Sequence, residues 1–187
     1  MKYLIAGLGN IGDEYRNTRH NIGFIIADAL ALEAKASFEP GRYADVSRIK
    51  YRGRTLVVIK PSTYMNLSGK AIRYWLKEEN IPGERMLSVL DDIALPLGTL
   101  RVRRGGGDGG HNGLASLIEY LGTADFPRLR IGVGDDFARG YQSDYVLGKW
   151  TKTEEEIMIP QVNKAVEVVK SFVTVGLDRT MNTYNNK

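Results

Sequence analysis

Cysteine is absent from this sequence of 187 residues, and that absence removes several kinds of chemistry at once. Without thiols the chain can form no disulfide, hold no thiolate metal site and use no cysteine nucleophile. A chain without cysteine also suits a reducing compartment, and we expect the protein to work in the cytoplasm.

Long apolar segments are missing as well. No run approaches the length of about 20 apolar residues that a membrane-spanning helix needs. Residues 1–9 are typical of a strand that runs into a turn, and they lack the basic start, apolar middle and cleavage site of a signal peptide. We therefore expect no contact with a membrane.

Histidine is scarce, with His20 and His111 the only two in the chain. Their separation excludes a His-Glu-x-x-His zinc site, and the Gly-x-Ser-x-Gly motif of many serine hydrolases does not occur. The residue pattern leaves open a metal held by carboxylates alone, from Asp91, Asp92, Asp135 and Asp136.

The overall composition indicates one globular domain over residues 1–187. Hydrophobic residues make up 43% of the chain, which is enough to bury a sizeable core. The net charge of +4 and the pI of about 9.2 favour polyanionic partners without identifying one.

Strand and helix patterns alternate along most of the chain. We expect strands at residues 2–6, 46–51, 55–60, 86–90, 99–104, 129–133 and 145–147. We expect helices at residues 22–35, 69–79, 112–121 and 154–175, followed by a polar, frayed tail from about residue 179. This alternation predicts an α/β fold, a single-domain sandwich with a mixed, mostly parallel central sheet flanked by helices.

Two polar residues precede expected helices and are typical N-caps. Asn21 stands before residues 22–35, and Ser68 stands before residues 69–79. Their side chains are expected to accept hydrogen bonds from the first free backbone N–H groups of those helices.

Four unusual loops follow expected strands, at residues 9–20, 62–68, 91–96 and 105–112. The carboxyl ends of parallel strands form the binding crevice of such sheets, so we expect the loops to converge there. His20 in the first loop can serve as a general base, because an unperturbed imidazole titrates at about pH 6.5.

A histidine base needs a carboxylate that fixes its tautomer and stabilises the imidazolium. Asp91 lies at the end of an apolar strand and is the best placed candidate. Asp92 is not expected to contact the same histidine, because the side chains of adjacent residues diverge.

The same loops carry three asparagines, Asn10, Asn66 and Asn112. Each of them alone is typical of a turn or a cap. Because an amide can donate to a carbonyl oxygen and accept from a peptide N–H, the three together predict a polar pocket for an amide-bearing substrate.

Two glycine-rich stretches match nucleotide-binding patterns only in part. Residues 7–12 read Gly-x-Gly-x-x-Gly, but a loop follows where a dinucleotide fold starts its helix. After residues 105–110, His111 stands where a phosphate-binding loop needs lysine. The alternative of a nucleotide-binding oxidoreductase rests on this pattern alone, and failure to bind NAD in a titration would end it.

Arginines alternate along two expected strands, with Arg101 and Arg103 on one and Arg128 and Arg130 on the other. Alternate residues of a strand share one face. If the strands are neighbours, Arg103 and Arg130 can clamp a phosphate, whereas Arg101 and Arg128 are expected on an ordinary solvated face.

Four segments, in order along the chain, resemble the signatures of bacterial peptidyl-tRNA hydrolases. They are GLGN at residues 7–10 with Tyr15 and TRHNIG at residues 18–23, KPSTYMNLSG at residues 60–69, GGGDGGHNGL at residues 105–114, and RLRIGVG at residues 128–134. Together they extend over nearly the whole chain, so the resemblance is far more specific than any single motif.

This resemblance implies that the protein hydrolyses the ester between a peptide and tRNA, with His20 as the base and Asp91 as its partner. The implied substrate-binding residues are Asn10, Tyr15, Met65, Asn66, His111, Asn112, Arg103 and Arg130. The amides would bind the peptide end and the reacting carbonyl, Tyr15 and Met65 would flank the terminal adenosine and peptide, and the two arginines would hold the 5′-phosphate.

The implied partner is peptidyl-tRNA, bound through its acceptor stem and its terminal CCA with the peptide. The resemblance implies a monomer that needs no metal, no organic cofactor and no obligate protein partner. A second interpretation is a non-catalytic RNA-binding module of the same fold, which would tolerate loss of the catalytic residues. This chain retains His20 and Asp91, and we expect a hydrolase.

Three residues depart from the family pattern. Ile11 stands where the family usually has proline, Ala94 replaces a second acid, and Asp108 adds a negative charge to the glycine run. The first change would loosen its loop, the second would remove a polar contact, and the third would weaken local RNA binding if it faces the substrate.

Overall fold

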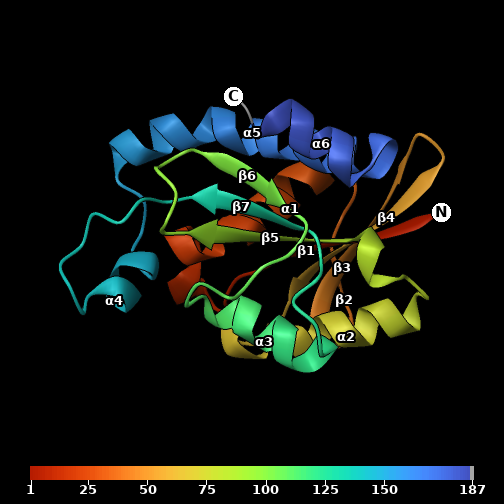
Figure 1. Cartoon of the computed structure of the whole chain (residues 1–187), viewed down its shortest axis with the longest axis horizontal. Coiled ribbons are helices and arrows are strands. Elements are labelled where there is room, and N and C mark those ends of the chain that lie inside the picture. Colours follow the sequence, from red (N-terminus) through yellow and green to blue (C-terminus); the bar gives the residue numbers. More distant parts are fainter. Residues whose placement is uncertain (186–187) are drawn as a thin grey trace.

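The computed structural model describes residues 1–185 and confirms a single-domain α/β sandwich (Figure 1). The strands are β1 (Lys2–Gly7), β2 (Glu39–Pro40), β3 (Ala44–Tyr51), β4 (Arg54–Pro61), β5 (Met86–Asp92), β6 (Leu100–Arg103) and β7 (Arg128–Gly132). They form one seven-stranded sheet in the order β2-β3-β4-β1-β5-β7-β6. The four strands β4, β1, β5 and β7 are parallel, and the pairs β2–β3, β3–β4 and β6–β7 are antiparallel.

Helices cover both faces of this sheet (Figure 1). On one face lie α1 (Ile22–Glu33), α5 (Lys152–Val175) and α6 (Leu177–Tyr184), and on the other lie α2 (Ser68–Glu78) and α3 (Asn112–Leu121). The short helix α4 (Gln142–Val146) projects beyond the edge toward which β5 and β7 point. Within residues 1–185, no helix combines the length and the apolar character needed to cross a membrane.

Two apolar cores follow from the alternation of side chains along the buried strands. Ile5 and Val89 belong to the core on the α1 and α5 side, and Leu4 and Leu90 belong to the core on the α2 and α3 side. Strands that are buried on both faces are nearly continuous apolar runs in the sequence. A buried charge at the end of such a run, as at Asp91, is therefore a strong sign of function.

A close approach between helix and sheet places the start of α1 against the ends of β1 and β5. A Cβ on Gly23 would lie 2.4 Å from both the Leu8 nitrogen and the Val89 oxygen, so only glycine allows this packing. The contact brings the 3-10 turn η2 (Arg19–Asn21), which directly precedes α1, against β5.

The expected strand at residues 145–147 is wrong. Tyr145 and Val146 belong to α4, and the Tyr145 hydroxyl donates a hydrogen bond of 2.5 Å to the Val133 carbonyl. The β-propensity of an aromatic and a β-branched residue is overridden because Tyr145 makes tertiary contacts with Val133 and Arg19 instead of pairing with a neighbouring strand.

The expectation of a frayed C-terminal tail is also wrong for the residues that the structure describes. Residues 177–184 form α6, in which Thr180 is buried and its hydroxyl lies 2.8 Å from the Ser171 hydroxyl. After the helix, the Asn185 amide pairs with both backbone groups of Val102, at 2.8 and 2.9 Å, along the free edge of β6. Residues 186–187 lie outside the described part of the chain.

The glycine run reaches the cleft by a route that the sequence does not indicate. Because β6 is antiparallel to β7, Arg103 at the end of β6 lies opposite Arg128 at the start of β7. The glycine run therefore starts at the amino edge of the parallel strands and returns along the α2 and α3 face before it reaches His111. Its expected start at a carboxyl edge is wrong, although its far end does arrive at the crevice.

Candidate active site

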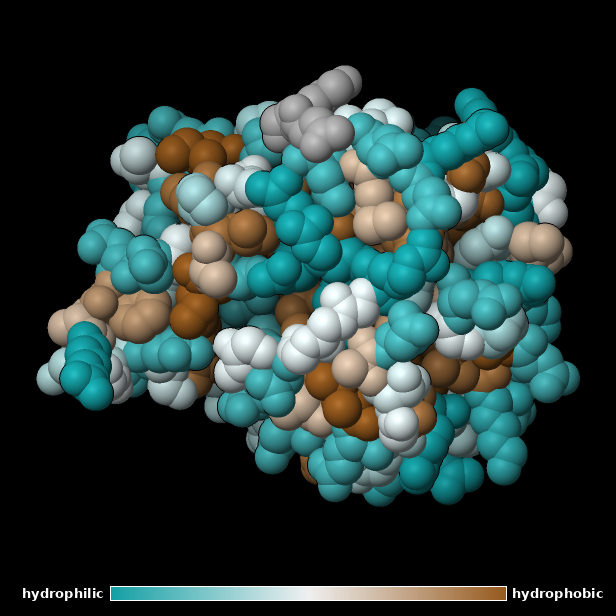
Figure 2. Space-filling view, in the orientation of Figure 1, coloured by the Kyte–Doolittle hydropathy of each residue, from teal (hydrophilic) through white to brown (hydrophobic). Residues whose placement is uncertain are grey.

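A cleft of about 730 Å³ lies at the carboxyl ends of the parallel strands. All four expected loops contribute to it, through Asn10, His20, Met65, Asn66, Asp91, Asp92, residues 105–110, His111 and Asn112. Figure 2 shows hydrophilic side chains in a band between the α5 and α6 layer above and the α2 and α3 layer below. The convergence of the loops is thus confirmed.

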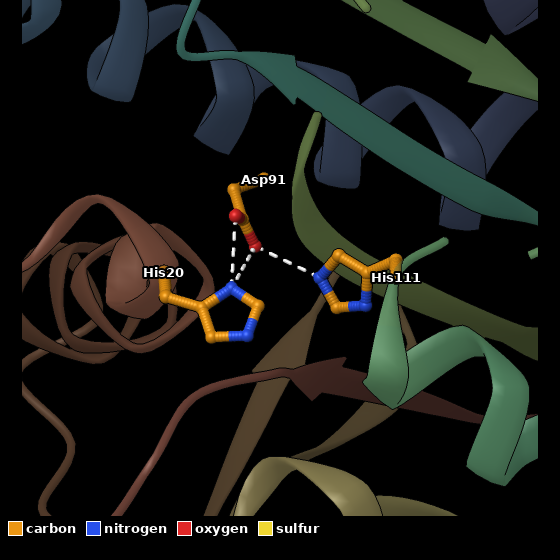
Figure 3. A group of neighbouring side chains, drawn as sticks. All are labelled: His20, Asp91 and His111. Atoms are coloured by element: carbon orange, nitrogen blue, oxygen red, sulfur yellow. Dashed lines mark hydrogen bonds and ion pairs between the residues drawn. The ribbon is translucent and has the colours of Figure 1, made fainter. Parts of the chain in front are cut away.

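His20 and Asp91 meet inside this cleft (Figure 3). His20 Nδ1 lies 2.9 Å from each carboxylate oxygen of Asp91, and the two residues are 8% and 2% exposed. A carboxylate only accepts hydrogen bonds, so Nδ1 carries the proton. His20 Nε2 forms no hydrogen bond with any of residues 1–185 and is free to take a proton.

The two adjacent acids diverge, as expected. Asp92 turns away from His20, and its carboxylate lies 2.5 Å from the guanidinium of Arg130. Its other oxygen accepts a hydrogen bond of 2.8 Å from the Ala94 nitrogen. Asp92 thus closes the turn after β5 by itself, without the second acid that the family usually has at residue 94.

The second histidine also contacts Asp91 (Figure 3). His111 Nε2 lies 2.8 Å from an Asp91 oxygen, and the rings of His20 and His111 are 4.9 Å apart. His111 Nδ1 accepts from the backbone nitrogens of Gly113 and Leu114, at 3.0 and 3.2 Å, and so caps α3. Although His111 lines the cleft, both of its ring nitrogens are used by protein groups.

The Asp91 carboxylate is ionised despite its burial. Burial acts to raise its pKa, but the two histidine donors outweigh burial and hold the pKa of Asp91 well below its usual range. The cleft therefore holds a fixed negative charge directly behind the candidate base.

Asn10 is built into the cleft by two neighbouring loops. Its Oδ1 accepts a hydrogen bond of 2.7 Å from the Met65 nitrogen, which leaves its amide NH₂ free of described partners. The Asn21 amide bonds to the Asn10 nitrogen and oxygen, at 2.8 and 2.9 Å. The expected capping role of Asn21 is therefore wrong, because its side chain holds the Asn10 backbone instead of the helix N-terminus.

Asn66 and Asn112 lie in two different helical segments, and both line the cleft. Asn66 is in the 3-10 turn η3 (Met65–Leu67), and Asn112 is the first residue of α3. Neither side chain bonds to any of residues 1–185, so both amides are available to a ligand. Ser68 does not cap α2 as expected, since its hydroxyl donates back to the Met65 carbonyl at 2.8 Å.

Tyr15 is an expected substrate residue that lies outside the lining of the cleft. Its ring packs edge-to-face on Tyr64 with 6.4 Å between centroids, and it does not line the cleft. Tyr64 is 54% exposed and was not indicated by the sequence pattern. The two rings form an aromatic rim beside Asn66 and Met65.

The four arginines of β6 and β7 share one face of the sheet. Arg101 lies opposite Arg130, and Arg103 lies opposite Arg128, so Arg103 and Arg130 are diagonal neighbours. Arg103 is exposed, whereas Arg130 lines the cleft and is held by Asp92.

The expected solvated position of Arg128 is wrong. This arginine is 2% exposed and donates to the carbonyls of Gly107 and Ala124, at 3.1 and 2.8 Å. Arg101 is half-buried and donates to the Asn185 carbonyl. The glycine run covers Arg128, and the sequence holds no sign of this burial because the alternation of the four arginines is uniform.

A wall of the cleft that the sequence pattern does not indicate is formed by Gln142, Ser143 and Val146 of α4 and by Leu147 directly after it. Arg19, the neighbour of the candidate base, ties this wall to η2. Its guanidinium pairs with Glu154 at 2.7 Å, donates to the Tyr145 carbonyl at 2.9 Å and lies 4.2 Å from the centroid of the Tyr145 ring. The sequence does not indicate that the arginine next to His20 is buried, because its burial depends on these contacts with distant residues.

The carboxylate of Asp108, which adds a negative charge here, forms a hydrogen bond within the glycine run. This carboxylate accepts a hydrogen bond of 2.8 Å from the Gly110 nitrogen, and the Asp108 carbonyl accepts one of 2.9 Å from the His111 nitrogen. Both bonds shape the turn that delivers His111 to Asp91. Ile11, the other loop departure, is 39% exposed and lines a second, smaller cleft on the far side of Asn10.

His20, Asp91 and His111 place their ligand atoms within 4.8 Å of one another, close enough for a cation. The tautomer of His111 argues against one. Because Nδ1 accepts from two backbone N–H groups, the ring proton is on Nε2, the atom that faces Asp91. A metal on Nε2 would force the proton onto Nδ1, against both donors.

Comparisons with known proteins agree with this geometry. The family model described as Peptidyl-tRNA hydrolase matches residues 4–187. A peptidyl-tRNA hydrolase of Phocaeicola vulgatus is 54% identical over 187 residues, with 100% of each chain covered. Another, of Porphyromonas gingivalis, is 52% identical over 186 residues, which are 99% of this chain and 100% of the relative.

The fold leads to the same family. A crystal structure of peptidyl-tRNA hydrolase from Acinetobacter baumannii superposes with a TM-score of 0.92 at 34% identity, covering 98% of this chain and 94% of that chain. Sequence relatives and structural neighbour thus agree over nearly the full length. This chain belongs to the peptidyl-tRNA hydrolase family.

Proposed function

We propose that this protein hydrolyses the ester bond between a peptide and tRNA, with His20 as the general base. One observation carries the proposal: a histidine whose Nδ1 is fixed on a buried carboxylate turns a free Nε2 toward a cleft that holds unpaired amides. That arrangement suits attack of water on a carbonyl that is flanked by peptide groups.

In the first step, His20 Nε2 accepts a proton from a water molecule while the water oxygen attacks the ester carbonyl carbon. The carbonyl π electrons move onto oxygen and form a tetrahedral oxyanion. When the carbonyl re-forms, the bond to the 3′ or 2′ oxygen of the tRNA breaks, and the imidazolium returns its proton to that oxygen. The products are a peptide with a free carboxyl group and a tRNA with a free hydroxyl group.

Asp91 supports this step by holding the Nδ1–H tautomer and by stabilising the imidazolium. The carboxylate stays ionised throughout, because its pKa lies well below the usual range. Its burial at 2% exposure keeps water from screening the interaction with His20.

The free NH₂ group of Asn10 and the free amides of Asn66 and Asn112 would bind the peptide backbone and the developing oxyanion. Met65 and the rim formed by Tyr15 and Tyr64 would flank the terminal adenosine and the first peptide residue. A preference for N-blocked substrates would follow, because a free α-ammonium group would be poorly solvated among these groups.

Arg103 and Arg130 are proposed to bind the 5′-phosphate of the tRNA as diagonal neighbours on β6 and β7. The partner would be the acceptor stem and terminal CCA of peptidyl-tRNA. We further propose that the protein works as a monomer in the cytoplasm. We also propose that it needs no metal or organic cofactor, because its own groups suffice for the hydrolysis.

The test compares hydrolysis of N-acetyl-aminoacyl-tRNA and unblocked aminoacyl-tRNA by the wild type, His20→Ala and the surface control Arg16→Gln. Only the blocked substrate should be cleaved, and His20→Ala should lose about 100- to 10,000-fold in kcat. Cleavage that survives His20→Ala would overturn the proposed base. Binding of tRNA without cleavage by the wild type would favour a non-catalytic RNA-binding module.

The phosphate clamp has its own test. Arg130→Ala should raise KM for substrates with a 5′-phosphate and leave KM unchanged for short substrates that lack the 5′ end. An equal loss on both substrates would contradict the clamp, because Arg130 would then act on the reacting end.

A further inference from the structure

We propose that His111 is a positioning residue that shares the Asp91 carboxylate with His20, and that this sharing adjusts the pH at which the base becomes active. The inference rests on the proposed function, in which His20 removes a proton from water. It gives His111 a role that acts through Asp91 and not through contact with the substrate.

The hydrogen bonds define the protonation state of His111 (Figure 3). Its Nδ1 accepts from the Gly113 and Leu114 nitrogens, which are donors only, so Nδ1 carries no proton. Its Nε2 faces an Asp91 oxygen at 2.8 Å and must donate to it. His111 is therefore a neutral imidazole with its proton on Nε2.

Protonation of this ring is opposed by its place in the fold. A proton on Nδ1 would face two N–H groups and would break the side-chain cap of α3. The N-terminus of a helix also carries partial positive charge, which disfavours a cation there. His111 is thus held neutral, while His20, whose Nε2 is free of described partners, is the histidine that can change charge.

Asp91 receives both donors within a very small space. His20 Nδ1 lies 2.9 Å from both of its oxygens, and His111 Nε2 shares one of these oxygens at 2.8 Å. A hydrogen bond from a neutral donor withdraws negative charge from a carboxylate. Asp91 therefore stabilises the His20 imidazolium less strongly than it would without His111, and the base stays unprotonated to a lower pH.

The other charged groups around the pair are already engaged. From β5 and β7, Asp92 and Arg130 pair with each other at 2.5 Å. From η2, Arg19 is paired with Glu154 at 2.7 Å. From the glycine run, the Asp108 carboxylate is bonded to the Gly110 nitrogen. Arg128 is bonded to backbone carbonyls, and Asp91 is the charge that directly contacts both histidines.

Two variants separate the two jobs of His111. In His111→Asn, the amide oxygen can cap α3, but the side chain is too short to reach Asp91. In His111→Gln, the amide NH₂ can reach Asp91, but the cap is lost. The pair has the same functional group, so each variant serves as the matched control for the other.

The first readout is kcat/KM against pH with N-acetyl-aminoacyl-tRNA. His111→Asn should move the acid limb up by about 0.5–1 pH unit, which is about 3- to 10-fold lower activity on that limb, and should approach the wild type at alkaline pH. His111→Gln should leave the limb in place while it lowers thermal stability. A decrease in kcat/KM that is the same at every pH in both variants would overturn the proposal, because a purely structural role of His111 predicts that result.

The second readout is ¹⁵N NMR of the imidazole nitrogens, which needs no substrate. The chain has only two histidines, so the signal that disappears in His111→Asn assigns both. His111 should show the Nε2–H neutral form throughout the titration, and His20 should titrate at higher pH in His111→Asn. A His111 signal that becomes doubly protonated near neutral pH, or an unchanged His20 titration, would overturn the proposal.

The two readouts also separate this inference from the proposed function. If the wild type fails to cleave the blocked substrate, the proposed function fails, while the NMR titration still decides whether His111 tunes His20 through Asp91. If cleavage occurs and the NMR titration of His20 is unchanged in His111→Asn, only the role of His111 fails.

Discussion

Two buried arginines brace different walls of the cleft, and they do so by different chemistry. Arg19 holds the α4 wall through a carboxylate, Glu154, at 2.7 Å, and it stacks on the Tyr145 ring at 4.2 Å. Arg128 lies beneath the glycine run and donates to the carbonyls of Gly107 and Ala124, at 3.1 and 2.8 Å. No carboxylate of residues 1–185 forms an ion pair with Arg128.

The difference shows how charge is distributed across the cleft. The charge of Arg19 is neutralised beside the candidate base, so the α4 wall adds little field of its own. Burial lowers the pKa of Arg128, and the nearby Arg130 lowers it further, yet a guanidinium stays charged at neutral pH. The β6 and β7 side therefore keeps a positive charge, on the side where the 5′-phosphate is proposed to bind.

The largest effect is expected from Arg19→Met. It should lower the free energy of unfolding by about 2–4 kcal/mol, because the largely buried carboxylate of Glu154 would lose the guanidinium and keep only the Thr151 N–H as a partner. Urea denaturation measures the loss, and Glu154→Gln in the same chain should recover part of it. The control Arg16→Gln breaks an exposed pair with Asp13 and should cost less than about 0.5 kcal/mol.

Arg128→Met should lower the free energy of unfolding by a smaller amount, about 1–3 kcal/mol. The carbonyls of Gly107 and Ala124 lose their donor, but no charge is left unpaired. Backbone amides of residues 105–110 should exchange hydrogen faster, since the glycine run loses its support. A loss of unfolding free energy larger than that of Arg19→Met would reverse the comparison.

Gly148→Ala tests the packing at Arg19 from the other side. A Cβ there would lie 2.7 Å from Arg19 Nη1 and 3.1 Å from the Tyr145 oxygen, so we expect a loss of about 1–2 kcal/mol in unfolding free energy. The loss should shrink in the Arg19→Met background if the clash is with the guanidinium. Gly83→Ala is the matched control, because no atom within 4 Å would meet its Cβ.

The smallest effect is the pH dependence of the Arg19 pair. Burial acts to raise the pKa of Glu154, but hydrogen bonds from Arg19 and Thr151 leave it below the usual value. Because the pKa of Glu154 is lower in the folded state, its ionisation stabilises the protein at pH values above the unfolded-state pKa. This stabilisation is lost as the pH falls through the folded-state pKa. In Arg19→Met the lowering of the Glu154 pKa by the guanidinium is lost.

The difference in unfolding free energy between wild type and Arg19→Met should therefore narrow as pH falls below about 4.5. Denaturation at several pH values measures it. A gap that widens on acidification would mean that Arg19 does not act through the Glu154 carboxylate.

The sheet could be predicted from the sequence more accurately than the segments around it. The parallel strands were predicted well, because continuous apolar runs bounded by Gly, Pro or charged residues are a local pattern. The segment around Tyr145 was predicted wrongly, since its carbonyl and its ring contact Arg19, a residue more than 100 positions away. The predicted capping role of Asn21 was wrong for a similar reason, because its amide bonds to the backbone of Asn10 in another loop.

The candidate site shows the same division. The position of Asp91 at the end of a strand and of His20 in a loop after a strand could be predicted from the sequence, and so could the three asparagines in neighbouring loops. The capture of His111 by Asp91 was not readable, because the route of the glycine run depends on the antiparallel pairing of β6 with β7. The burial of Arg128 depends on that same route.

By itself, the sequence determined the α/β class, the residues that end each strand, the likeness to peptidyl-tRNA hydrolases and the pairing of His20 with one of two adjacent acids. These follow from periodicity and residue type, which are local properties of the chain. Only the tertiary structure decided which tautomer His111 adopts, which arginine is buried and what holds α4 against the base. Those depend on hydrogen bonds between segments far apart in sequence, and such bonds form only when the packed sheet brings the segments together.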